Sequence, residues 1–124
     1  MNDCPFCDII GKKLLIEISK YWAAFEDEYP VSPGHCLIVP QRHVESMFEL
    51  TDEELKDLYA VIVDIRNYIK TVLDPDGFNI GVNEGRAAGQ TVPHLHIHVI
   101  PRYNGDMEDP RGGIRGVIPE KQKY

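Results

Sequence analysis

The most regular pattern of apolar and polar positions lies in the middle of the chain and predicts a long helix. Apolar residues recur there at alternating spacings of three and four, on one stripe of a helix: Leu55, Leu58, Ile62, Ile65, Ile69 and Val72. Thr51 and Glu54 have the spacing of a capping box, in which each side chain accepts a hydrogen bond from a backbone N–H of the first turn. The helix is predicted from about residue 51 to 73, and the Asp- and Pro-containing run at 74–77 ends it.

Shorter apolar stretches bounded by proline and glycine predict strands. Residues 14–25 are rich in β-branched and aromatic side chains and should form two strands, while residues 36–39, 78–83 and 92–100 should form one each. Three strands, one long helix and two further strands favour an α+β fold with an antiparallel sheet over a parallel βαβ fold. The segment after Arg102 is rich in glycine, proline and charge, so we expect a domain at 1–102 and a tail at 103–124.

Composition narrows the class of protein. The 124 residues are 43% hydrophobic and 27% charged, as expected for one soluble globular domain. We expect no membrane partner, because no apolar run approaches the ~20 residues of a membrane span. The first residues lack the pattern of a signal peptide, so a cytoplasmic protein is expected. The net charge of −7 argues against nucleic acid as a partner, but a mononucleotide needs only a few local donors.

Three of the five histidines alternate along one predicted strand, at positions 94, 96 and 98. Alternate side chains of a strand share a face, so Leu95, Ile97 and Val99 would face the core and the histidines would line something else. A merely polar strand face and a three-histidine metal site are alternatives, although ligands on one flat face converge poorly on a single ion. Neutral imidazole is a good nucleophile at neutral pH, and the phosphorus–nitrogen bond that it forms is readily cleaved. The pattern favours nucleophilic attack on phosphorus.

Two of the three cysteines, Cys4 and Cys7, have the spacing of a zinc hook or of a redox pair. A thioredoxin-like redox site needs a strand before the motif, and the few preceding residues cannot supply one. Spacing alone leaves zinc undecided, because no compact second pair of ligands follows.

The segment from Gly89 to Arg102, GQTVPHLHIHVIPR, resembles the signature of the histidine-triad (HIT) superfamily. The run from Pro33 to Pro40 followed by His43 is also typical, as is Asn83-Glu84-Gly85. The resemblance therefore extends from Cys4 to Arg102. It implies the HIT fold, a five-stranded antiparallel sheet with one long helix, forming a half-barrel that pairs in a homodimer.

The resemblance also implies roles for individual residues. His96 would be the nucleophile and form a nucleotidyl-imidazole intermediate that water hydrolyses. His98 would bind a phosphate oxygen and support the leaving group, and His35 would buttress the triad, which is close to the alternative of a buried histidine bonded to backbone. Residues matching phosphate-binding positions are Asn83, Gly89, Gln90 and Thr91.

The nucleoside end of the site is implied less directly. Asp27 matches a ribose-binding position, although a solvated aspartate between Glu26 and Glu28 is an alternative. An apolar adenine slot could be formed by residues that could equally belong to the core: Phe6, Ile9, Phe25 and Leu37.

Many bacterial members of this superfamily resemble the chain in carrying two N-terminal cysteines that complete a structural zinc site. Their other two ligands match His43 and His94, so the implied ligand set is Cys4, Cys7, His43 and His94. Four protein ligands close a tetrahedral site, as structural zinc requires. Cys36, on a buried strand, would then be an inert apolar residue.

Within the superfamily, the chain most resembles the dinucleoside polyphosphate hydrolases that cleave substrates such as diadenosine tetraphosphate. Phosphoramidases usually follow the triad with a glycine pair, whereas here Pro101 and Arg102 follow it. Arg102, Arg111 and Arg115 could meet the additional phosphates, unless the tail is simply charged or serves a dimer contact. The cysteine pair, absent from eukaryotic dinucleotide hydrolases, keeps two alternatives open: a nucleoside phosphoramidase and a dinucleotide phosphorylase. A non-catalytic nucleotide-binding regulator is a further alternative, against which the intact His96 argues.

Overall fold

The computed structural model describes residues 4–12 and 15–124, apart from the side chains of residues 9, 11 and 12. The helices are α1 (Pro5–Lys12) and α2 (Asp52–Leu73), and the strands are β1 (Glu17–Ile18), β2 (Trp22–Glu26), β3 (Cys36–Pro40), β4 (Gly77–Gly81) and β5 (Ile97–Arg102). The strands form one antiparallel five-stranded sheet in the order β1-β2-β3-β5-β4. The predicted α+β fold with a five-stranded antiparallel sheet and one long helix is confirmed.

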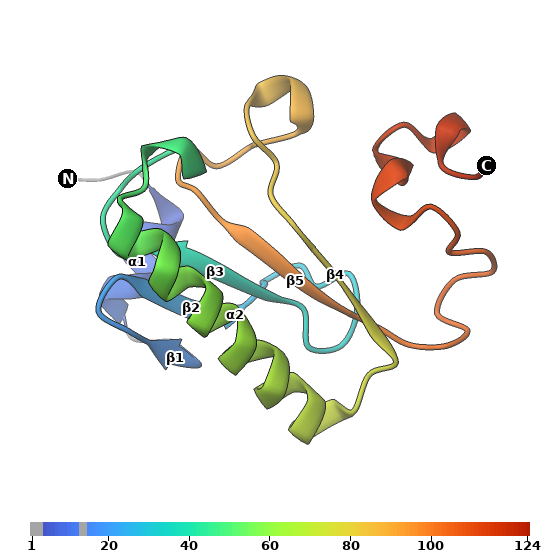
Figure 1. Ribbon diagram of the computed structural model, residues 1–124, viewed down its shortest axis with the longest axis horizontal. Coiled ribbons are helices and arrows are strands. Elements are labelled where there is room, and N and C mark those ends of the chain that lie inside the picture. The colour runs from blue at the N-terminus through green and yellow to red at the C-terminus, as the bar shows by residue number, and fades with distance from the viewer. Residues whose placement is uncertain (1–3, 13–14) are drawn as a thin grey trace.

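Helix α2 lies diagonally across one face of the sheet (Figure 1). The predicted capping box is present: the Glu54 N–H donates to Thr51 Oγ1 over 3.1 Å, and the Thr51 N–H donates to Glu54 Oε1 over 2.8 Å. The predicted apolar stripe is wrong at its ends, because Leu55 and Val72 are exposed. The buried apolar residues of the helix are Leu58, Val61, Ile65 and Ile69, whose spacing follows the 3.6-residue period around the helix more closely.

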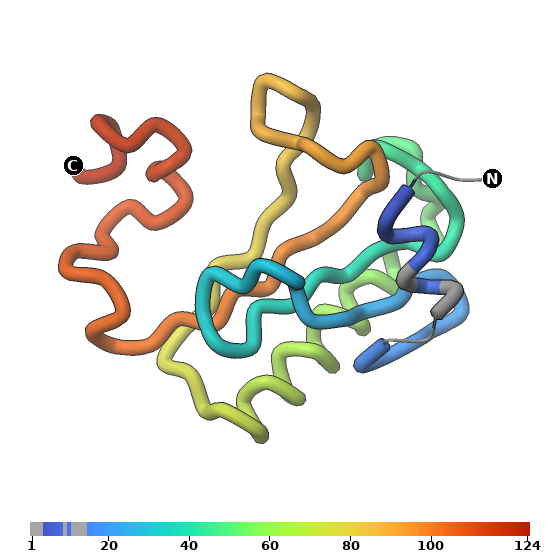
Figure 2. Tube along the Cα trace, turned by 180° about the vertical axis from the view of Figure 1, so that it is seen from behind, coloured from blue at the N-terminus to red at the C-terminus, as the bar shows by residue number. Residues whose placement is uncertain are grey.

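The opposite face of the sheet is covered by α1, which the sequence pattern did not predict (Figure 2). Only eight residues long, α1 depends on packing for its stability. Phe6 from this helix packs on the sheet in a second apolar cluster whose other buried members are Cys4, Ala23, Phe25, Leu37 and Val39. Both faces of β3 are therefore buried.

The histidine segment enters the sheet later than predicted. Strand β5 begins at Ile97, so Val92 to His96 lie outside the sheet ladder. Pro93 has no N–H to donate, the His94 N–H turns back to the Val92 carbonyl, and the Leu95 N–H bonds Val44 instead. The predicted alternation nevertheless holds, because Leu95, Ile97 and Val99 all lie in the core that packs against α2. His96 and His98 accordingly face the α1 side.

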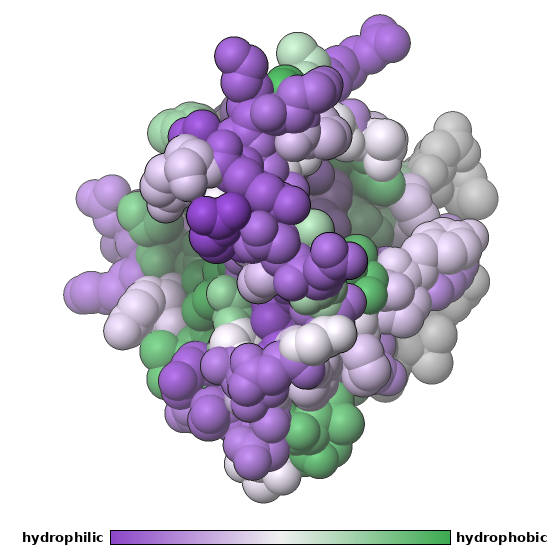
Figure 3. All heavy atoms as spheres, turned by 90° about the vertical axis from the view of Figure 1, so that its right-hand side faces the viewer, coloured by the Kyte–Doolittle hydropathy of each residue, from purple (hydrophilic) through white to green (hydrophobic). Residues whose placement is uncertain are grey.

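The segment 103–124 follows β5, returns beside the edge strand β4 and contains two short 3₁₀ helices, Gly113–Val117 and Pro119–Lys121 (Figure 1). Among the described residues, neither apolar cluster includes a residue from this segment. Viewed from this side, the surface is mostly hydrophilic, with smaller hydrophobic areas between the polar side chains (Figure 3). Within the described chain, neither helix has the length and apolarity needed to cross a membrane.

Candidate active site

A cleft of about 590 Å³ opens on the α1 side of the sheet. It brings together most of the residues that the sequence analysis singled out: Phe6, Phe25, Asp27, His35, Leu37, Asn83, Gly89, Thr91, His96 and His98. They come from α1, β2, β3, β5 and the loops after β2 and β4. One surface thus gathers side chains from widely separated parts of the chain.

His96 presents a free ring nitrogen to this cleft. Its Nδ1 lies 2.9 Å from the carbonyl oxygen of His94. A carbonyl only accepts hydrogen bonds, so Nδ1 carries the proton and Nε2 keeps its lone pair. Phe6 packs edge-on against the imidazole at a centroid distance of 4.9 Å and helps to fix the ring. The predicted nucleophile is therefore held in the tautomer that a nucleophile needs.

His98 is held in the opposite tautomer, with its proton on Nε2, through its contact with His35. The Val31 N–H donates to Nδ1 of His35 over 3.0 Å, so the proton of His35 lies on Nε2. Nε2 of His35 lies 2.9 Å from Nδ1 of His98 and donates its hydrogen to it. The Asp27 carboxylate lies 3.3 Å from the same His35 nitrogen. Nδ1 of His98 accepts, which leaves its Nε2–H as a donor. The two histidines of the cleft therefore offer complementary groups, one nucleophile and one donor.

Burial disfavours the charged forms of His98 and His35. It is the main cause that lowers the pKa of His98 to about 4; positive charge on His96 and His35 contributes to this shift, and Asp27 opposes it. Burial also lowers the pKa of His35, again opposed by Asp27. His98 thus acts as a neutral hydrogen-bond donor above this pKa.

The predicted phosphate-binding residues divide into two groups. Asn83, Gly89 and Thr91 line the cleft, and Gly89 has a positive φ of 94° that favours glycine. Gln90 does not line it. Its amide braces the loop, accepting from the Gly85 N–H over 2.9 Å and donating to the carbonyls of Glu45 and Val92 over 3.0 and 3.2 Å. Gln90 therefore holds in place the loop that carries the predicted phosphate-binding residues Gly89 and Thr91.

Asp27 and the predicted apolar slot also line the cleft. Asp27 is not a solvated surface residue, because its carboxylate accepts from the Tyr29 N–H over 2.9 Å and lies beside His35. Phe6, Phe25 and Leu37 belong to the apolar cluster under α1 and also line the cleft, so they serve both as core and as wall. The side chain of Ile9 lies outside the described residues.

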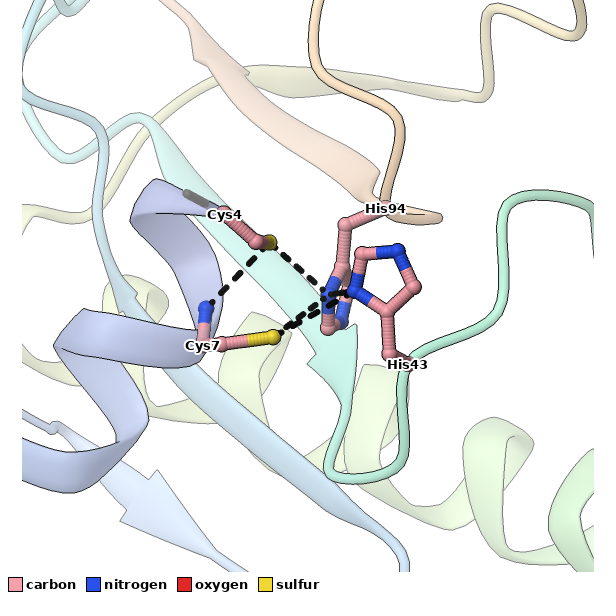
Figure 4. A group of neighbouring side chains, drawn as sticks. All are labelled: Cys4, Cys7, His43 and His94. Atoms are coloured by element: carbon pink, nitrogen blue, oxygen red, sulfur yellow. Dashed lines mark hydrogen bonds between the residues drawn. The ribbon is translucent and has the colours of Figure 1, made fainter. Parts of the chain in front are cut away.

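A second cluster lies behind the histidine segment, where Cys4, Cys7, His43 and His94 point toward one another (Figure 4). Nδ1 of His94 lies 3.2 Å from the Cys4 sulfur, 3.4 Å from the Cys7 sulfur and 3.1 Å from Nδ1 of His43. Tetrahedral zinc, with bonds of about 2.0–2.3 Å, holds its ligand atoms about 3.3–3.8 Å apart. The donor set suits zinc, and the distances from His94 Nδ1 lie within or slightly below this range.

His94 is prepared for such a ligand role. Its Nε2 lies 2.9 Å from the Pro40 carbonyl and so carries the proton, which leaves the Nδ1 lone pair facing the two sulfurs. Burial lowers the pKa of His94 and favours the neutral ring that a metal ligand requires. Cys36 lies apart from the cluster, and burial raises the pKa of its thiol to about 12.

The arginines predicted to meet additional phosphates are engaged elsewhere. Arg102 bonds both carboxylate oxygens of Asp106, over 2.8 and 2.7 Å. Arg111 pairs with Asp109, and Arg115 donates to backbone carbonyls of the tail. The tail instead brings Ile114 and Val117 to an apolar cavity of about 330 Å³ that shares His35, Asn83 and His98 with the cleft.

One backbone group and one pair of apolar side chains near the site were not predicted from the sequence, for different reasons. The backbone N–H of Val31 sets the tautomer of His35, and no side-chain pattern could reveal it. Ile114 and Val117 were grouped with a charged tail, although the short apolar series Ile114, Val117, Ile118 was visible there.

Comparison with known proteins agrees with this geometry. A model of the HIT domain matches residues 11–105, and the protein belongs to the HIT domain family. It is 42% identical over 91 residues to the bis(5'-nucleosyl)-tetraphosphatase (asymmetrical) of Schizosaccharomyces pombe, covering 73% of this chain and 50% of that one. It is 42% identical over 94 residues to the AP-4-A phosphorylase of Mycobacterium tuberculosis, covering 75% of this chain and 48% of that one. The chain thus spans about half the length of these two relatives.

Among solved structures, the fold is similar to that of a zinc-bound histidine triad family protein from Mycobacterium smegmatis. The two share 33% sequence identity with a TM-score of 0.77, over 86% of this chain and 80% of that one.

Proposed function

We propose that the protein is a dinucleoside polyphosphate hydrolase in which Nε2 of His96 attacks the α-phosphate of an adenine dinucleotide. The observation that carries the proposal is the hydrogen bond of 2.9 Å from His96 Nδ1–H to the His94 carbonyl, which leaves Nε2 free in the cleft. The two enzymes to which the chain is similar support the substrate class, since both are named for tetraphosphate dinucleotides. The coarser assignment, a nucleotide-processing enzyme of the HIT family, is common to both.

The reaction proceeds in two displacements. Nε2 of His96 forms a bond to the α-phosphorus as the bond to the bridging oxygen breaks, and the remaining nucleotide leaves with that electron pair. The Nε2–H of His98 donates to the phosphate group and stabilises the charge that develops on oxygen, with Asn83, Gly89 and Thr91 beside it. Water then attacks phosphorus, the histidine leaves with its lone pair, and AMP is released.

The nucleoside is proposed to bind at the end of the cleft opposite Gly89 and Thr91. The apolar walls formed by Phe6, Phe25 and Leu37 suit an adenine ring, and Asp27 is placed to accept from ribose hydroxyls. Asp27 also contacts His35, so nucleoside binding and the orientation of His98 share one carboxylate.

The cluster of Cys4, Cys7, His43 and His94 is proposed to hold structural zinc. Four protein ligands leave no open position, so zinc there stabilises the fold and does not act on substrate. The cluster fixes His94, and the carbonyl of that same residue orients His96. The zinc-bound relative supports this assignment.

We further propose that the unit acts as a homodimer and that segment 103–124 contributes to the substrate site or to the dimer contact. Support comes from two observations on apolar residues. Ile80, Ile114, Val117 and Ile118 are exposed at this end of the molecule, and the first three of them line the cavity beside His98.

Product analysis separates the proposed function from its alternatives. We expect diadenosine tetraphosphate to give AMP and ATP without added phosphate. ADP and ATP formed only when phosphate is present would instead indicate a phosphorylase. Cleavage of adenosine phosphoramidate alone would indicate a phosphoramidase, and binding without turnover of any of these compounds would indicate a regulator.

Replacing His35 tests the histidine chain. His35→Leu removes the donor to His98 and should lower kcat on the order of 10²-fold with little change in KM, because the nucleophile and the nucleoside contacts remain. His35→Gln can still donate from its amide nitrogen and should retain more activity than the leucine variant. Steady-state kinetics of the two variants on diadenosine tetraphosphate would show this, and equal losses in both would contradict the proposed donation.

A further inference from the structure

Arg86 differs from the other arginines of the protein. Arg42, Arg102 and Arg111 form ion pairs, Arg66 packs over the ring of Phe78, and Arg115 bonds backbone carbonyls. The guanidinium of Arg86 has no hydrogen-bond or ion-pair partner among the described residues. It is therefore the one arginine of the described chain whose full set of donors is available to a ligand.

Arg86 lines a hollow of about 640 Å³ that adjoins the catalytic cleft. Gly89 and Thr91 line both spaces, so the hollow begins where the cleft passes the predicted phosphate-binding residues. The segment that carries Arg86, Arg86–Ala88, is a short 3₁₀ helix in a loop that projects between β4 and β5 (Figure 1). A Cβ added at Gly85 or Gly89 would meet no atom within 4 Å, so the space above this loop is open.

The charged residues that line the cleft are unevenly distributed. The part that is proposed to hold the nucleoside is lined by three carboxylates, those of Glu26, Asp27 and Glu28. A chain of phosphates extending from His96 would be repelled from that end, especially on a protein of net charge −7. In the adjoining hollow Arg86 is the cation, although the exposed carboxylate of Glu45 lines it too and weakens the attraction.

We propose that Arg86 binds the phosphates of the leaving nucleotide and thereby selects polyphosphate substrates over those with an uncharged leaving group. The inference rests on the proposed function, because it places the α-phosphate at His96. A guanidinium fork matches the spacing of phosphate oxygens and remains charged at every relevant pH. Arg86 is thus assigned a specificity-determining role that Arg102, Arg111 and Arg115, whose guanidinium groups are already hydrogen-bonded within the protein, do not fill.

Binding measurements test the inference without relying on turnover. Isothermal titration calorimetry would compare AMP with α,β-methylene-ATP, which has two further phosphates and resists cleavage at the α-position. The wild-type protein should bind the methylene analogue more tightly than AMP. Arg86→Ala should weaken the analogue about tenfold to a hundredfold and leave AMP nearly unchanged. Arg86→Lys should lie between these limits, because the charge remains and the fork is lost.

Arg66→Ala is the matched control, since it removes the same charge from α2 on the other side of the sheet. It should leave both affinities unchanged. The inference is overturned if Arg86→Ala weakens both ligands alike, if it weakens neither, or if the wild type does not distinguish them. Failure of the proposed function has a different signature: no cleavage of diadenosine tetraphosphate by the wild type while the selective effect of Arg86→Ala persists.

Discussion

Replacing His96 by asparagine is expected to reduce turnover of diadenosine tetraphosphate by at least about 10⁴-fold. The amide of asparagine can still donate to the His94 carbonyl, but no ring nitrogen remains to attack phosphorus. Because only a nucleophile is removed, nucleotide binding should persist. Steady-state kinetics gives the loss, and the affinity for AMP shows that the cleft is intact.

This variant is also informative about the fold. His96 is only 7% exposed and packs against Phe6 and His98, so the circular dichroism spectrum and thermal unfolding should be checked beside activity. Activity within tenfold of wild type in a folded His96→Asn protein would contradict the assignment of His96 as the nucleophile.

The second large effect concerns the proposed zinc site. Cys4→Ser should abolish stoichiometric zinc and lower the melting temperature by more than about 10 °C, because a structural zinc contributes several kcal/mol to folding. Elemental analysis of protein purified without chelator should find about one zinc per wild-type chain. Activity should fall as well, because His94 is a proposed ligand and its carbonyl holds the nucleophile.

Cys36→Ser is the matched control for this prediction. The Cys36 thiol is buried on β3 and donates to the Gly34 carbonyl over 3.2 Å, a contact that serine can reproduce. The control should keep its zinc and much of its thermal stability. Wild-type protein without metal, or Cys4→Ser protein with unchanged zinc and melting temperature, would rule out the site.

The sequence predicted the start of α2 and the alternation of the histidine segment well, because local signals are strong there. The capping box of Thr51 and Glu54 and the alternation around His96 both depend on near neighbours in the chain, and both are present. Strand β5 was predicted too early because Pro93 breaks the ladder while leaving the alternation intact. Helix α1 was missed because a short helix is specified mainly by its packing on the sheet.

The sequence predicted most of the residues that form the site, but not the hydrogen bonds that they make. Most of the residues named from the family resemblance converge on the cleft or on the cysteine–histidine cluster, whereas their hydrogen bonds are set by tertiary structure. Gln90 is an example: its amide braces the loop through Glu45, which is distant in sequence. The partners of the arginines could not be predicted from the sequence either: Arg102 pairs with Asp106, and Arg111 pairs with Asp109.

The proposed zinc site and the candidate active-site cleft are joined through a single residue. The side chain of His94 faces the two cysteines, while its backbone carbonyl accepts from His96. A loss of metal is therefore expected to act on catalysis by misorienting the nucleophile, with no participation of the ion in the reaction. This coupling gives a physical reason for one segment to carry both sites.

A covalent nucleotidyl-His96 intermediate determines the stereochemical course at phosphorus, which can be measured. A dinucleotide with a stereochemically defined α-phosphorothioate would be hydrolysed in ¹⁸O-water and the configuration of the product determined. Two successive in-line displacements predict overall retention of configuration. Inversion would mean that water attacks the α-phosphorus directly, and would contradict the account.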